Sequence, residues 1–85
     1  MRTEDAIESI KRYVERGIPT GDFLRAVLSN DLIQALGRAD ESSRENLFEI
    51  CTYIYNGIPS ETWGSPRKYE AWLDKKHKER INESI

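Results

Sequence analysis

The side chains that could do chemistry are few and stand far apart in the chain. Cys51 and His77 are the only cysteine and the only histidine among the 85 residues. A cysteine nucleophile needs a base within hydrogen-bond reach, and a zinc site needs several such ligands at a regular spacing. Because Cys51 lies in the most apolar segment and His77 in a highly charged one, we expect Cys51 to be a small buried side chain. We therefore expect neither a catalytic pair nor a metal site.

Carboxylates are plentiful but follow no pattern that acid–base or metal chemistry requires. Asp31 and Asp40 stand where helix starts favour negative charge. Glu41, Glu45 and Glu49 share one helical stripe, without the Glu-x-x-His pair of a di-metal site. The interpretation is a solvated acidic face. No glycine-rich phosphate loop occurs either, so the sequence predicts a protein that is not an enzyme and binds no cofactor.

The elements that would position any site are predicted to be helices packed into one small domain. A chain of 85 residues rarely forms two cores. Its 38% apolar and 33% charged residues are typical of a soluble globular protein, and its net charge is −2. The chain start lacks the apolar core of a signal peptide, and no apolar run approaches the about 18 residues of a membrane span. We expect a cytoplasmic protein.

The fold class predicted from the helix signals is all-α, a compact bundle of about five helices. Two are long, two are short, and one is C-terminal. Thr3 caps the first helix and Gly17 ends it in a left-handed conformation. Thr20 caps the second helix, and Asn30 or Ser29 caps the third. The positions predicted to face the core are Ile7, Ile10, Val14, Phe23, Val27, Leu32, Ile33 and Leu36, with Ala6, Tyr13, Leu24 and Leu28 beside them.

A fourth helix, from Asp40 to about Asn56, is predicted to be long and central. Asp40 can cap it, and Ser42 with Glu45 forms a capping-box pattern. Its apolar residues cover more than half of its circumference, which is typical of a helix surrounded by others. These residues are Leu47, Phe48, Ile50, Cys51, Tyr53, Ile54 and Tyr55.

The last helix begins at Ser65-Pro66, where serine caps and proline is favoured at the first helical position. It presents Tyr69, Trp72 and Leu73 to the core. We expect residues 1–73 to form the helical domain and residues 74–85 to form a charged helical extension that frays at its end.

Gly-Ile-Pro occurs twice, at residues 17–19 and 57–59. Each copy follows a predicted helix with a tyrosine four residues before the glycine, and each is followed by Thr or Ser. The pattern predicts the same stop used twice: a left-handed glycine, an apolar clamp and a proline that prevents continuation. An internal duplication is the alternative interpretation.

Two surfaces could bind a partner. Trp63 lies in a connector with Gly64 and Ser65, where burial is hard to arrange, and Tyr55 is near. Trp63 could equally close one end of the bundle. Trp and Tyr are common anchors of protein interfaces. The second surface is the exposed face of the last helix around Lys68, Lys75 and Lys76.

Nucleic-acid binding by the C-terminal helix is the alternative, since residues 64–85 hold six Lys and Arg against four Asp and Glu. The second and third predicted helices could imitate a helix-turn-helix. The helix after Asn30 would then be the recognition helix, but it begins with an acidic residue and offers only one Gln and one Arg to phosphates or base edges. Self-association through the broad face of the fourth helix is a further alternative.

The stretch from Tyr13 to Leu73 resembles a group of short uncharacterised proteins encoded by tailed bacteriophages and bacterial prophages. The similarity rests on Phe23 to Leu32, Ala39-Asp40, Tyr55-Asn56 and Trp63 to Ser65. It implies a non-enzymatic accessory protein that acts in the bacterial cytoplasm by binding a host or phage protein, and it assigns no reaction or target.

Overall fold

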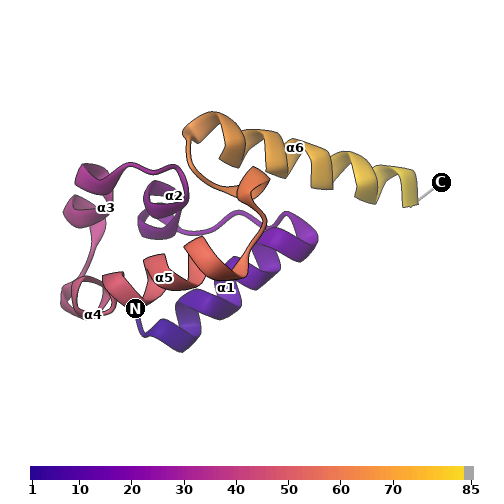
Figure 1. Cartoon of the computed structure of the whole chain (residues 1–85). Coiled ribbons are helices and arrows are strands. Elements are labelled where there is room, and N and C mark those ends of the chain that lie inside the picture. The colour runs from indigo at the N-terminus through magenta and orange to yellow at the C-terminus, as the bar shows by residue number, and fades with distance from the viewer. Residues whose placement is uncertain (84–85) are drawn as a thin grey trace.

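Six α-helices and one 3-10 turn form the regular structure of residues 1–83, the part of the chain that the computed structural model describes (Figure 1). The all-α prediction is confirmed, and these residues contain no strand. The elements are α1 (Thr3–Arg16), α2 (Asp22–Leu28), α3 (Leu32–Arg38), α4 (Glu41–Glu45), α5 (Leu47–Gly57), the 3-10 turn η1 (Ser60–Thr62) and α6 (Pro66–Glu83).

The helix count exceeds the predicted five because the expected fourth helix is divided at Asn46. This residue adopts φ −98° and ψ 3°, outside the helical region. Its side-chain amide donates a hydrogen bond to the Met1 carbonyl at 3.2 Å. The contact holds the junction of α4 and α5 against the chain start. Asn side chains that hydrogen-bond to backbone groups compete with the helical hydrogen bonds, which is why a helix can be interrupted at such a residue.

α5 lies beside α1, while α2 and α3 pack against each other on the other side of the molecule (Figure 1). α6 crosses the C-terminal end of α1 and then extends past the other helices, which gives the molecule its 44 Å length against widths of 23 and 21 Å. α6 is continuous from Pro66 to Glu83. The fraying predicted at the chain end falls on residues 84–85, outside the described part.

The core is drawn from α1, α2, α5 and α6, but two helices are rotated from their predicted orientation. In α1 the fully buried residues include Ala6 and Tyr13, while Ile7 and Val14 are half-buried. In α2 Leu24 and Leu28 are buried where Phe23 and Val27 were expected. The core as a whole comprises Ala6, Ile10, Tyr13, Leu24, Leu28, Ile50, Ile54, Tyr69 and Trp72. The burial predicted for Tyr69 and Trp72 is confirmed.

Three aromatic side chains, Tyr13, Tyr69 and Trp72, join α1 to α6, and we call them the aromatic joint. The rings of Tyr13 and Tyr69 stack with centroids 4.9 Å apart. The Tyr13 hydroxyl donates to the Thr62 carbonyl at 2.8 Å, and the Trp72 indole N–H donates to the Tyr13 carbonyl at 3.0 Å. Burial raises the pKa of the Tyr13 hydroxyl, so it remains a donor. The joint therefore buries aromatic area with its polar atoms paired.

Of the five helix N-caps predicted from the sequence, two are correct and three are wrong. The Asp40 carboxylate accepts from the Ser43 N–H at 2.7 Å, and Ser65 caps α6 by accepting from the Lys68 N–H at 3.1 Å. Thr3 instead lies inside α1 and donates to Glu49 at 2.9 Å.

The other two incorrect caps flank α2. Its cap position is Gly21, because Thr20 is occupied with the Tyr69 hydroxyl, to which its N–H donates at 2.9 Å. Asp31 caps α3 by accepting from the Gln34 N–H at 3.2 Å, and Asn30 takes a left-handed turn with φ 60°. In both cases the neighbouring polar residue was already engaged in a tertiary contact or a turn.

The two Gly-Ile-Pro stops differ, so the prediction of one mechanism used twice is wrong. Gly17 has φ 68°, and its N–H donates to the Tyr13 carbonyl at 2.9 Å, as predicted for a left-handed stop. Gly57 has no positive φ and ends α5 beneath the Tyr53 ring. The absence of a side chain at Gly17 also matters for packing, because a Cβ there would lie 2.3 Å from the Lys76 Cβ.

Candidate functional site

Five large apolar side chains of α3 and α5 lie on the surface. Their exposed fractions are Leu32 58%, Ile33 77%, Leu36 42%, Phe48 82% and Tyr55 74%. The prediction that α3 presents its apolar residues to the core is wrong, as is the prediction that α5 is enclosed. Cys51, expected to be buried, is exposed as well.

Small contacts on the inner sides of both helices explain this exposure. Only Ala35 of α3 is buried, so this short helix packs through one methyl group. α5 packs through Ile50 and Ile54. Residues three, four and seven positions apart share a helix face, which places Phe48, Cys51 and Tyr55 on one side of α5, with Cys51 nearest the core.

Two adjoining hollows connect the exposed side chains of α3 with those of α5. The smaller one, of about 60 Å³, is lined by residues that include Leu32, Leu47 and Cys51. The larger one, of about 220 Å³, is lined by residues that include Cys51, Tyr55 and Trp63. The two hollows share Cys51 in their lining, so they bring Leu32, Tyr55 and Trp63 into one region. Leu36 lies one helical turn from Leu32 and from Ile33, and Phe48 lies one turn from Cys51, so these exposed side chains extend the same region along the two helices. We call it the α3–α5 face, and it comprises Leu32, Ile33, Leu36, Phe48, Cys51, Tyr55 and Trp63.

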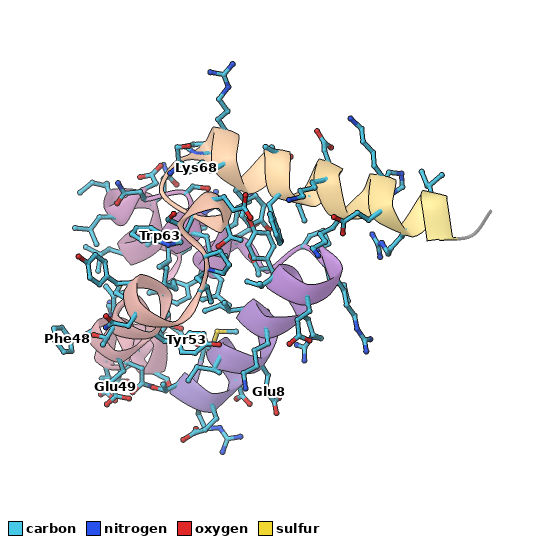
Figure 2. All side chains as sticks on the ribbon, turned by 45° about the vertical axis from the view of Figure 1, so that its right-hand side comes forward. Glu8, Phe48, Glu49, Tyr53, Trp63 and Lys68 are labelled. Atoms are coloured by element: carbon cyan, nitrogen blue, oxygen red, sulfur yellow. The ribbon has the colours of Figure 1, made fainter. Side chains whose placement is uncertain are left out.

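No charge lies on the outer side of α5. The only charged residue between Asn46 and Ser60 is Glu49, which accepts a hydrogen bond from the Thr3 hydroxyl of α1 at 2.9 Å. Figure 2 shows Phe48 pointing away from the ribbon, with Glu49 on another side of the same helix. The α5 part of the face is therefore apolar, while Asp31 lines the smaller hollow at its border with α3. An apolar helix side of this kind suits contact with another apolar surface.

Tyr55 and Trp63, both predicted binding residues, meet at one edge of this face. Their rings make an edge contact with centroids 6.2 Å apart. Trp63 is half-buried, and its indole N–H is buried without a hydrogen-bond partner. The sequence could not decide between an exposed anchor and a lid, and Trp63 has properties of both: it packs against the core and lines the larger hollow.

The neighbouring residues Gly64, Ser65 and Lys68 hold the connector in place. Gly64 has φ 117°, and its N–H donates to the Leu28 carbonyl at 2.8 Å, which ties the connector to α2. Ser65 caps α6, and the Lys68 ammonium donates to the Ser60 carbonyl at 3.3 Å. Figure 2 shows Lys68 on the far side of Trp63 from Phe48.

Lys75 and Lys76 line neither hollow of the α3–α5 face, and both are engaged on their own helix or its neighbour. Their ammonium groups stand 5.1 and 5.0 Å from the centre of the Trp72 ring. Lys75 also approaches Glu61 at 4.0 Å, and Lys76 pairs with Glu79 at 3.2 Å. The two surfaces predicted from the sequence therefore lie apart, and only the Tyr55–Trp63 edge belongs to the apolar face.

The exposed residues Leu32, Ile33, Leu36 and Phe48 were not predicted as binding residues. For Phe48 one signal could have indicated the exposure: the apolar arc of α5 covers more than half of its circumference. In a chain of 85 residues, too few helices exist to surround such an arc on all sides. A wide arc in a small protein therefore indicates an exposed apolar side as readily as a central helix.

Among residues 1–83 no group of three His, Cys, Asp or Glu side chains is placed to hold a metal ion. Partial burial raises the pKa of the Cys51 thiol, which disfavours the reactive thiolate. Within the same part of the chain, no helix is both long and apolar enough to cross a bilayer.

Comparisons with protein-family models, curated proteins and solved structures find no match to this chain.

Proposed function

We propose that the protein is a non-enzymatic accessory protein that acts by binding another protein through the α3–α5 face. The observation that carries the proposal is the amount of apolar side chain exposed on α3 and α5. Five large apolar side chains, each at least two-fifths exposed, stand on these two helices. Exposed apolar side chains gathered in one region of a folded monomer are characteristic of interaction sites.

The character of the face favours a protein over a nucleic acid. Nucleic-acid binding depends on Lys and Arg placed against phosphates, whereas the outer side of α5 carries no charge. The basic residues Lys75 and Lys76 are partnered by Trp72 and by nearby carboxylates. Binding a phosphate would require them to exchange these partners. A protein surface that exposes several aromatic residues, by contrast, is typical of recognition sites.

The setting of this activity comes from the resemblance to phage and prophage proteins. On that basis we propose that the partner is a host or phage protein and that binding takes place in the bacterial cytoplasm. A small folded protein can act there by covering a functional surface of its partner, which requires an interface of about 800 Å² on each side.

Affinity capture with matched variants tests this proposal. The double variant Phe48→Ser/Tyr55→Ser is compared with wild type and with Ile81→Ser, which alters an apolar residue of α6 that is 48% exposed. Because all three side chains are exposed, the helical circular dichroism is expected to stay unchanged. We expect wild type and Ile81→Ser to retain the same bacterial proteins, and the double variant to lose them. Equal retention by all three proteins would contradict the proposal.

The nucleic-acid alternative is tested separately by replacing Lys75, Lys76 and Lys78 with Gln. Retention of DNA or RNA at low salt that falls steeply with added salt and is lost in this variant would favour it over protein binding. We expect no such retention.

A further inference from the structure

We propose that the partner of the α3–α5 face is a second copy of the same chain, related by a two-fold axis that passes beside Cys51. The inference rests on the proposed function, because it takes the same face as a protein-binding surface, and it assigns that face to a second copy in place of a host or phage protein. Three features of the face point to this occupant: the spacing of its aromatic residues, the placement of its charges, and the match between a projection and a hollow.

The spacing on α5 is self-complementary. Phe48 and Tyr55 are seven residues apart, so they lie on the same side of the helix, separated by about 10 Å along its axis. The midpoint between them falls between Cys51 and Thr52. When two copies of α5 pack antiparallel about this point, Phe48 of each copy opposes Tyr55 of the other. One contact is thus made twice, which is the defining property of a two-fold interface.

The charge distribution permits this pairing. A residue close to a two-fold axis meets its own equivalent, so any charge there would meet a like charge. Cys51 and Thr52, the residues nearest the axis, are uncharged at neutral pH, and burial raises the pKa of the Cys51 thiol further. Glu49, the one charged residue of α5, is held by the Thr3 hydroxyl on α1.

The shape of the face provides both parts of the contact. Phe48 projects with 82% of its surface exposed. The hollow beside Tyr55 and Trp63 has a volume of about 220 Å³, and a cavity of about 150 Å³ is enough to admit benzene. In the antiparallel pairing, Phe48 of one copy lies next to the hollow of the other.

The aromatic residues also supply much of the area that a dimer needs. The antiparallel pairing covers Phe48 and Tyr55 of both copies, and an aromatic side chain buries about 150–250 Å². Four such side chains provide a substantial part of the about 1,600 Å² that a standard interface buries in total. Dimerisation would cover the largest apolar side chains that the folded chain leaves exposed.

Sedimentation or light scattering across a range of protein concentrations tests the dimer. We expect wild type to reach twice the mass of the 9.9 kDa chain. The variant Phe48→Arg would place a guanidinium group in the apolar hollow, and we expect its dissociation constant to rise by at least about 30-fold, as for an interface hot spot. Ile81→Arg, altered on α6, is the control and is expected to dimerise like wild type. All three proteins are expected to share the same helical circular dichroism.

The single cysteine supplies a second measurement that reports on the axis itself. Two Cys51 thiols beside a two-fold axis are expected to be joined by a short bismaleimide in wild type and in Ile81→Arg, but not in Phe48→Arg. A monomeric mass at every concentration, or a dimer that Phe48→Arg leaves unchanged, would overturn the inference.

These outcomes also separate this inference from the proposed function. If wild type is monomeric but loses its captured proteins in Phe48→Ser/Tyr55→Ser, the binding face is correct and its occupant is a different protein. If wild type is monomeric and capture does not depend on these residues, both proposals fail.

Discussion

The aromatic joint and the α3–α5 face use the same kinds of side chain in opposite ways. In the joint, Tyr13 is fully buried and its hydroxyl is paired with the Thr62 carbonyl. On the face, Tyr55 is 74% exposed and Phe48 82% exposed. Trp63 is intermediate between these two cases: its side chain is half-buried, and its indole N–H is buried without a hydrogen-bond partner.

The difference indicates which aromatic residues complete the fold and which are available for contacts outside the chain. Buried aromatic residues with paired polar atoms contribute to folding. Exposed aromatic residues gathered on one face contribute little to the stability of the monomer, and such patches are characteristic of interaction sites. Mutations in the two regions are therefore expected to separate stability from binding.

The largest expected effect comes from making the same substitution in both regions. Tyr13→Ala removes a fully buried ring and leaves the Thr62 carbonyl without its donor, so we expect a loss of about 3–5 kcal/mol in the free energy of unfolding. Tyr55→Ala is expected to cost less than about 1 kcal/mol. Urea denaturation followed by circular dichroism measures both. Similar losses for the two variants would remove the distinction between joint and face.

An intermediate effect is expected from glycines in the two regions. Gly17→Ala forces a side chain into a left-handed position with φ 68° and within 2.3 Å of the Lys76 Cβ, so we expect destabilisation by about 1–3 kcal/mol. Gly37 of α3 has nothing within 4 Å of an added Cβ. Gly37→Ala is therefore expected to stabilise the protein by about 0.5–1 kcal/mol through helix propensity.

Thermal or urea unfolding of the two glycine variants gives the comparison directly. A stable Gly17→Ala protein would mean that α6 does not pack over the end of α1 as closely as the structure has it.

The smallest effect concerns Asp40, which caps α4 ahead of the face. Hydrogen bonds from the Ser43 N–H and from the chain's terminal ammonium lower the pKa of this carboxyl from 3.8 to about 2. A folded pKa below the unfolded one means that the carboxylate stabilises the fold above pH 4 and that this contribution is lost as pH falls from about 4 toward about 2.

Melting temperatures measured between pH 2 and pH 5 check this expectation. Asn is also a good helix cap but does not titrate, so Asp40→Asn should reduce the change of melting temperature over this interval. Identical pH profiles for wild type and Asp40→Asn would show that the carboxyl is not coupled to folding.

Much of the local structure follows directly from particular residues in the sequence. The left-handed stop at Gly17, the caps at Asp40 and Ser65, and the burial of Tyr69 and Trp72 were all predicted. Each depends on interactions within a few residues or on a strongly amphipathic pattern. The meeting of Tyr55 with Trp63 was also expected from their closeness in the chain.

Only the tertiary structure decided which part of each apolar stripe faces inward. Thr20 does not cap α2 because its hydroxyl lies 3.1 Å from the Tyr69 hydroxyl, 49 residues away in the chain, and forms a hydrogen bond with it. α4 and α5 separate at Asn46 because its amide reaches Met1. Leu32, Phe48 and Cys51 are exposed because α3 and α5 are already packed through their other sides. Periodicity identifies a helix as amphipathic, but burial depends on neighbours distant in sequence, and 85 residues provide too few helices to cover every apolar side.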